Sequence, residues 1–280
     1  KAGGKAIDGT FTWTNGTFKP AAGDYPASWT FTPAKGYEEY ATATGTATVT
    51  VDPKAVTVSI TPNGGTYGSV TAAAAVLSGV VDGETVLVTL TYTGTANDGT
   101  AYADTTPPAK AGTYTITATT TNPNYTLDPK TTTADFTIAK RPATVTPNNQ
   151  SKVYEEKDPD LTYAVSGVLD GETLKGITLA RAEGENAGEY DITGTADAGA
   201  NPNYDVTFAK GTFTIKPKSI QSATVVLGKG LAANGAEQTQ TVEKVLLDGK
   251  ELPANSYTVA GNTATAPGSH TLTITAKGNY

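Results

Sequence analysis

The one histidine of the chain, His270, is the first residue to consider for chemistry. Because the chain also has no cysteine, a serine-histidine-aspartate triad or a histidine-ligated zinc would depend on this side chain. His270 follows Pro267-Gly268-Ser269, and Tyr190 stands in the same place after Ala187-Gly188-Glu189. Because tyrosine occupies the equivalent position of another repeat, we expect the histidine side chain to pack against the protein rather than to act in catalysis. We therefore predict a non-enzymatic protein with no catalytic residue.

Carboxylates are the next candidates, and they gather at Glu155, Glu156, Asp158 and Asp160. Calcium takes roughly six to eight oxygen ligands, and Lys157 interrupts this group, so we expect a solvated turn instead. The Asp-Gly-Glu strings at 82–84 and 170–172 lack the remaining ligands of a calcium loop, and Asp-Gly favours tight turns. Two distant carboxylates for glycoside cleavage stay open, although repetition argues against a unique site. We predict no metal and no cofactor.

Aromatic side chains could stack on sugar rings, and both tryptophans of the chain lie near its beginning. Trp13 and Phe11 alternate with threonine, as do Trp29 and Phe31, so we expect these four side chains to pack in a core. Phe18 belongs to the same aromatic group. Tyr37 and Tyr40 remain candidates for contact with a glycan.

A covalent cross-link is a further possibility. Some surface domains of Gram-positive bacteria join Lys to Asn beside an acidic residue, and every part of this chain contains these residue types. The same types occur in almost any protein, so the sequence leaves the cross-link open. Each bond would release one ammonia, and an intact mass would detect that loss.

The composition excludes several classes of partner. The 280 residues carry a net charge of -7, with no cluster of Lys and Arg of the kind that binds phosphates, so nucleic acid is not expected. No apolar run approaches the roughly 20 residues of a membrane helix. The 30 glycines and 16 prolines favour short strands and tight turns. Because no Met stands at position 1, we expect an internal portion of a longer polypeptide.

An internal repeat organises the chain. An Ala-Gly-x-Tyr element recurs around Gly23, Gly112 and Gly188, with a variant at Gly268, at a spacing of roughly 80 residues. A second landmark, Gly-Val-x-Asp-Gly-Glu-Thr, occurs at 79–85 and 167–173, and 246–251 is a looser copy. The string NPNY appears at 122–125 and 201–204. Two landmarks in one order at matched spacing establish the repeat.

The repeat divides the chain into four segments. The first segment (1–52) is a partial immunoglobulin-like repeat, the second (53–139) and third (140–216) are closely related β repeats, and the fourth (217–280) is an immunoglobulin-like repeat. Short Pro-Lys joints separate them, and proline restrains its neighbours, so we expect an elongated rod. Alternation such as Tyr114-Thr115-Ile116-Thr117-Ala118 predicts half-buried strands. The predicted fold is all-β, built from tandem immunoglobulin-like β-sandwiches, with at most one helical turn near 170–174.

Short sequence motifs predict where the turns of each repeat lie. Ala-Gly-x-Tyr is expected to form a tyrosine corner, in which the hydroxyl donates to nearby backbone. Asn-Pro-Asn favours a turn, so NPNY is predicted to be a turn that leads into a returning strand rather than a recognition motif. In the fourth segment no closing strand follows Asn279-Tyr280. We therefore expect this repeat to lack its last strand, to be the least stable, and to show an open edge or strand pairing at the chain ends of an otherwise monomeric protein.

Three stretches carry a family resemblance: 153–163, 166–174 and 187–192. Together they resemble the MBG ("mostly beta, glycine-rich") repeat, closely over 140–216 and well over 53–139, where 62–68 keeps only the Tyr-Gly part of the opening motif. MBG repeats occur in tandem on large bacterial surface proteins. The resemblance implies an extracellular setting, at the cell surface or secreted, a structural stalk or adhesive role, an unknown protein or glycan ligand, and no catalytic residue. The alternative is a carbohydrate-binding accessory module of a larger secreted enzyme or adhesin.

Overall fold

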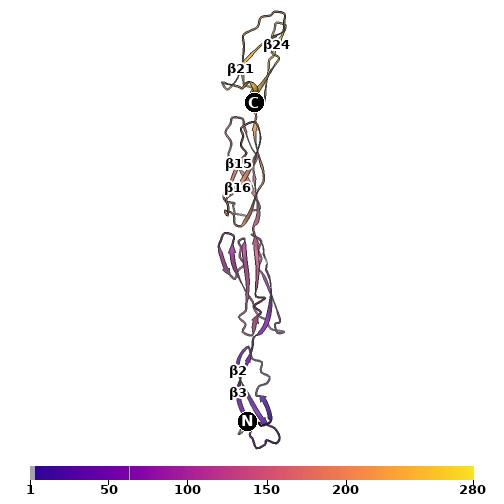
Figure 1. Ribbon diagram of the computed structural model, residues 1–280, viewed down its shortest axis with the longest axis vertical. Helices are drawn as coiled ribbons and strands as arrows, with labels where there is room; N and C mark the ends of the chain where they lie inside the picture. The colour runs from indigo at the N-terminus through magenta and orange to yellow at the C-terminus, as the bar shows by residue number, and fades with distance from the viewer. Residues whose placement is uncertain (1–3, 63) are drawn as a thin grey trace. The chain divides into compact units, whose positions relative to one another are not determined.

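The computed structural model describes residues 4–62 and 64–280, so residues 1–3 and Asn63 of the opening motif lie outside the described part. The described residues form β-strands joined by turns and loops, with one 3-10 turn and no α-helix among them (Figure 1). The all-β prediction is confirmed. The chain divides into two compact units, Lys1–Lys140 and Arg141–Tyr280. The four segments and their immunoglobulin-like connectivity stay predictions, and the segment names serve below as labels.

The first segment contains one antiparallel sheet with the order β1-β2-β3. Its strands are β1 (Gly9–Trp13), β2 (Gly23–Pro33) and β3 (Ala43–Val51). Phe11 pairs with Phe31 and Trp13 with Trp29, so these rings share one face as the alternation predicted. However, Phe11 is 67% exposed and Trp13 is 52% exposed. The predicted core packing of Phe11 and Trp13 is wrong, because no second sheet covers this face among the described residues.

The second segment contains two sheets, with the orders β10-β4-β6 and β5-β11-β9-β7-β8. The strands of the first sheet are β4 (Lys54–Thr61), β6 (Ala74–Ser78) and β10 (Tyr125–Leu127). The strands of the second are β5 (Gly65–Thr66), β7 (Thr89–Ala96), β8 (Ala101–Asp104), β9 (Gly112–Thr119) and β11 (Thr133–Ala139). Two of the pairings, β10 with β4 and β11 with β5, are parallel.

The third segment repeats this plan with the sheets β14-β12-β17 and β13-β18-β16-β15. Its strands are β12 (Arg141–Pro147), β13 (Gln150–Val153), β14 (Tyr163–Ser166), β15 (Ile177–Arg181), β16 (Gly188–Ala196), β17 (Tyr204–Phe208) and β18 (Gly211–Lys216). The same two pairings are again parallel, β12 with β17 and β13 with β18. The shared plan accounts for the shared sequence landmarks.

The fourth segment is more divided, with the sheets β19-β21-β22, β20-β24 and β23-β25. Its elements are β19 (Thr224–Leu227), β20 (Gln238–Thr239), β21 (Val242–Leu247), β22 (Lys250–Glu251), the 3-10 turn η1 (Ala254–Ser256), β23 (Tyr257–Ala260), β24 (Thr263–Ala264) and β25 (Thr273–Ala276). β25 pairs with β23 and with no second strand among the described residues, whereas β16 lies between β15 and β18.

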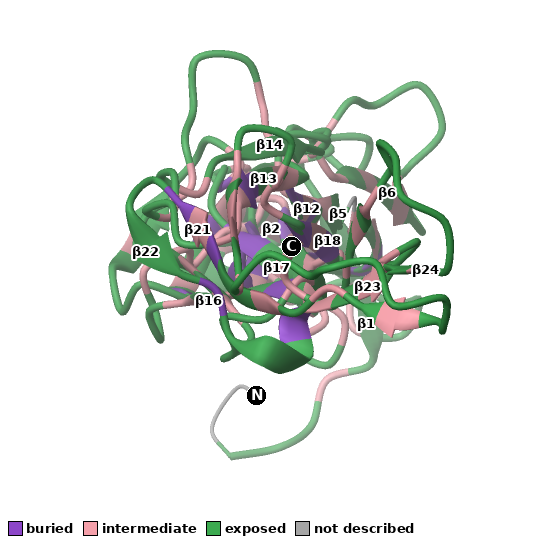
Figure 2. Cartoon of the chain, turned by 90° about the horizontal axis from the view of Figure 1, so that it is seen from above, coloured by how far each residue is buried: buried purple, intermediate pink, exposed green. Residues whose placement is uncertain are grey.

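Burial follows the alternation of the strands. Phe213 and Ile215 of β18 are buried and the threonine before each of them is only partly covered, because successive side chains of a strand point to opposite faces. Buried residues are a minority of the chain and lie mainly on strands (purple in Figure 2). The clusters in the second, third and fourth segments are separate from one another. The fold thus depends on several small cores.

The two related segments differ at the turn after their second strand. Tyr67 and Tyr154 are equivalent, because each donates its backbone N–H to the closing strand of its own segment, at Ala139 and Lys216. The next residue has a left-handed backbone in both, with φ of 80° at Gly68 and 70° at Glu155. Glycine adopts this conformation freely, whereas a glutamate is strained there. The third segment therefore keeps the backbone of the motif without its glycine.

Candidate functional site

A tyrosine-glutamate contact joins the two repeated landmarks in both related segments. Tyr125, the last residue of the first NPNY, accepts the backbone N–H of Val81 at 3.2 Å and donates its hydroxyl to the Glu84 carboxylate. Tyr204 of the second NPNY likewise accepts the N–H of Leu169 at 3.1 Å and donates to Glu172. The NPNY tyrosine thus begins its strand, as predicted, and also ties the returning strand to the Asp-Gly-Glu turn.

This contact gives the repeated Asp-Gly-Glu string a structural role. The backbone N–H groups of Glu84 and Glu172 close hydrogen-bonded turns to Val81 and Leu169, so the helical turn considered for 170–174 is replaced by a tight turn. The hydrogen bond to Glu84 raises the pKa of Tyr125, and burial followed by the bond to Glu172 raises that of Tyr204. Among the described residues no group of three or more acidic or histidine side chains could hold a metal ion.

Two of the three predicted tyrosine corners, those of Tyr114 and Tyr190, are present. Tyr114 donates its hydroxyl to the Lys110 carbonyl at 2.9 Å, and Tyr190 donates to the Asn186 carbonyl at 2.7 Å, in each case four residues back along the chain. His270 makes the same contact through its Nε2, which lies 2.9 Å from the Ala266 carbonyl. The histidine therefore takes the structural place of the corner tyrosine, but it is exposed and does not show the packing that its register predicted.

The two corners are expected to differ in strength. Tyr114→Phe should lower the free energy of unfolding by about 1–2 kcal/mol, because Tyr114 is buried and its hydrogen bond to the Lys110 carbonyl is partly buried. Tyr190→Phe should cost less, about 0.5–1 kcal/mol, because water reaches the exposed Asn186 carbonyl. Urea denaturation of the two variants measures the difference. Equal costs would show that burial does not set the strength of the corner.

The acidic group at 155–160 lies in an exposed turn, from which Asp158 reaches two cations. Asp158 binds Lys152 at 2.7 Å and Arg181 at 2.5 Å, and Glu185 binds the same two cations, at 2.5 Å from the lysine Nζ. The Lys152 and Arg181 side chains are only 4% and 12% exposed. Arg181 also lies over the Phe213 ring, 5.1 Å from its centroid. We call these four charged residues the charge cluster. Asp158 takes part in it, while Glu155, Glu156 and Asp160 are exposed, as the predicted solvated turn requires.

The charge cluster brings together a lysine amine and two carboxylates, which are ingredients for an amide cross-link of a different kind from the Lys–Asn bond considered above. Condensation would need an uncharged amine and a protonated carboxyl group. The pairing favours the opposite state, since it raises the pKa of Lys152 and lowers the pKa values of Asp158 and Glu185. The charged states that the pairing favours therefore suit an ion-pair cluster rather than an amide bond.

The charge cluster should make stability depend on acid. The ordinary carboxyl pKa values are 3.8 and 4.5, and both are lowered in the fold, Asp158 chiefly by Arg181 and Glu185 chiefly by Lys152. The stabilisation is therefore complete above about pH 5 and is lost as the pH falls through the folded-state values. We expect the fall in melting temperature between neutral and acidic pH to be smaller in the double variant Asp158→Asn with Glu185→Gln. Equal falls in both proteins would contradict a role of the cluster, since all other carboxylates are shared.

An exposed aromatic surface lies in the first segment and includes Trp13, which the alternation had placed in a core. Trp13 and Phe18 line a groove of about 690 Å³, and Tyr25 completes its aromatic wall. Phe18 is 59% exposed and meets Tyr25 edge-on at 6.2 Å. The predicted glycan candidates Tyr37 and Tyr40 are half-buried, and their ring centroids lie 6.4 Å apart. The open aromatic surface is thus the one around Trp13.

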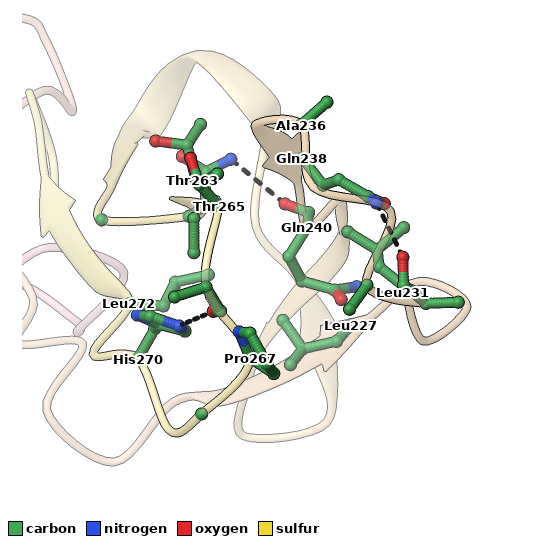
Figure 3. A pocket seen from close by; sticks show the side chains of 17 residues that line it. Leu227, Leu231, Ala236, Gln238, Gln240, Thr263, Thr265, Pro267, His270 and Leu272 are labelled. Carbon is green, nitrogen blue, oxygen red and sulfur yellow. Dashed lines mark hydrogen bonds between the residues drawn. The ribbon is translucent and has the colours of Figure 1, made fainter.

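A second hollow, of about 360 Å³, lies in the fourth segment (Figure 3). Its walls are mainly small or apolar, and Leu227 and Leu231 are about half exposed. The amide of Gln238 donates to the Ala232 carbonyl, and the amide of Asn262 donates to the Gln240 carbonyl, so these groups hold the loops. His270 is the one ionisable residue of the lining, and its ring is held by the corner contact. This hollow assembles no acid-base pair.

The repeated tyrosine-glutamate contacts and corners define a class of protein, an all-β chain with internally repeated modules. Residues 143–214 match the family model of the MBG domain, YGX type, so the third segment is an MBG-type repeat, as its resemblance predicted. MBG domains are typical of extracellular bacterial proteins. No curated protein and no solved structure is significantly similar to the chain. Among the described residues no helix is long and apolar enough to cross a lipid bilayer.

Proposed function

We propose that the chain is a non-enzymatic spacer, a stalk or adhesive array of repeats in a cell-surface or secreted bacterial protein. One observation carries this proposal: the most repeated residues make contacts within their own module and so stabilise it. Examples are the pairs Tyr125–Glu84 and Tyr204–Glu172. Repetition of residues with structural roles is what we expect of a protein that holds other domains at a distance. The MBG match supports the extracellular setting.

Small-angle scattering of the full chain tests the spacer role. A compact globule of 280 residues would have a radius of gyration of about 19 Å. Because the sequence predicts short, proline-restrained joints, we expect a clearly larger radius and a long maximum dimension. A radius near the compact value would overturn the proposal. A hydrolytic activity retained by the purified chain would overturn its non-enzymatic part.

The groove around Trp13 favours a second candidate, a carbohydrate-binding module. Exposed aromatic rings offer faces on which sugars can stack, and Trp13 and Phe18 supply two such rings beside one groove. A glycan array would detect the binding. This candidate requires that Trp13→Ala and Phe18→Ala each abolish it while Tyr37→Ala leaves it intact. Absence of binding to any glycan, or loss through Tyr37 alone, would reject it.

A further inference from the structure

One asparagine connects neighbouring segments in each compact unit. In the first unit, the Oδ1 atom of Asn124 accepts the backbone N–H of Ala22 at 2.8 Å, across 102 positions of the chain. The carbonyl of the same asparagine accepts the N–H of Lys54 at 2.8 Å. Asn124 belongs to NPNY of the second segment, and Ala22 precedes the corner glycine of the first. The asparagine therefore ties the start of its own segment to the corner of the preceding one.

The second unit contains the same arrangement. Asn279 accepts the backbone N–H of Ala187 at 2.7 Å through its Oδ1, and its carbonyl accepts the N–H of Lys218 at 2.8 Å. Its amide also donates to Asn186 at 2.9 Å. Both asparagines and both alanines are half-buried. Because the contact occurs twice at matched positions, it is a recurring feature of the repeat.

Side chains reinforce the joint in the second unit. Lys218 binds Glu155 at 3.2 Å and Asp248 at 3.0 Å, which joins the third segment to the fourth. The strained backbone of Glu155 thus places a carboxylate where the second segment has only Gly68. Tyr154 meets Tyr280 edge-on, with ring centroids 5.4 Å apart. The asparagine contact is therefore the centre of a specific interface.

We propose that the alanine N–H before the corner glycine is a docking site whose partner is the asparagine of the following repeat, and that Pro267 closes this site in the fourth segment. Ala187 and Pro267 are equivalent, because Tyr190 and His270 make the same corner contact and the following glycines have φ of 155° and 149°. Proline has no N–H to donate. NPNY is thus a coupling element as well as a turn, and the fourth segment cannot receive a further repeat by this contact.

Amide hydrogen exchange in the full chain tests the docking contact directly. In Asn124→Ala the Ala22 amide should exchange roughly two- to tenfold faster, the change that the loss of one net hydrogen bond produces. Asn124→Asp keeps the acceptor oxygen and should preserve protection of Ala22. The strand amides of β9 serve as the control for an intact second segment. Unchanged exchange of Ala22 in Asn124→Ala, with β9 still protected, would overturn the proposal.

A distance measurement tests the role of proline. Because the chain has no cysteine, one protein can carry two spin labels and no others, at Thr178→Cys in the third segment and at Thr258→Cys in the fourth. Both positions are exposed. We expect one narrow distance distribution in the parent protein and in Ala187→Ser, and a broad one in Ala187→Pro. Asn279→Ala leaves the third segment unaltered and should broaden the distribution as well. A distribution that stays narrow in both Ala187→Pro and Asn279→Ala would refute the coupling.

Discussion

Replacement of Phe213 by alanine is expected to lower the free energy of unfolding of the third segment by about 3–5 kcal/mol. Phe213 is fully buried on β18, packs with Ile192 and Ile215, and supports the cation of Arg181. Truncation would leave a cavity that the short strands around it cannot fill. Because a small domain has only about 5–15 kcal/mol of stability, the loss approaches complete unfolding.

Urea denaturation followed by far-ultraviolet circular dichroism would measure this effect. Both tryptophans, Trp13 and Trp29, lie in the first segment, so tryptophan fluorescence provides an internal control that should not change. Phe213→Leu keeps most of the volume and is expected to cost no more than about 1.5 kcal/mol. If the alanine and leucine variants were equally stable, this core would be loose enough to collapse around the cavity.

Tyr204→Phe is the second substitution with a large expected effect. It should lower the free energy of unfolding of the third segment by about 1–3 kcal/mol. The hydroxyl both accepts the Leu169 N–H and donates to the Glu172 carboxylate, and Tyr204 is buried. Phenylalanine preserves the ring and removes both contacts at a place where water has little access. Leu169 and Glu172 lose their tyrosine partner together.

Glu172→Gln is the matched control, because the glutamine carbonyl can still accept the tyrosine hydrogen bond. Its cost in the same denaturation experiment should be smaller than that of Tyr204→Phe. A larger cost for Glu172→Gln would mean that the glutamate charge, and not the tyrosine hydroxyl, stabilises the turn. Retention of full stability by both variants would contradict a structural role for the pair.

The local features of the modules could be predicted because they depend on residues close in sequence. Alternation predicted a strand over 114–118, and the structure has β9 at Gly112–Thr119. The corner of Tyr190 and the start of a strand at Tyr204 also follow from nearby residues. The Tyr204–Glu172 contact spans 32 positions, and no local pattern specifies which distant side chain a hydroxyl will meet.

One error and one omission have the same physical origin. Alternation placed Phe11 and Trp13 on one face, but it cannot show whether a second layer lies against that face. Likewise, the local sequence around Lys152 and Arg181 does not show that distant carboxylates pair with these cations, whose side chains are largely buried. Comparison of the second and third segments could have indicated that the Arg181 side chain is largely buried. Arg181 pairs with Ile192 as Tyr92 pairs with Ile116, so a cation stands where the related segment buries a ring.

The parallel pairing of β13 with β18 determines how the third segment responds to a pulling force. β13 follows the first strand of the segment and β18 ends it, so tension applied at the two ends draws these strands in opposite directions along their length. The hydrogen bonds between them are then sheared together instead of opening one after another. Four residue pairs share this load in the third segment, but the matching β5–β11 ladder has only two. Under tension the second segment should therefore rupture before the third.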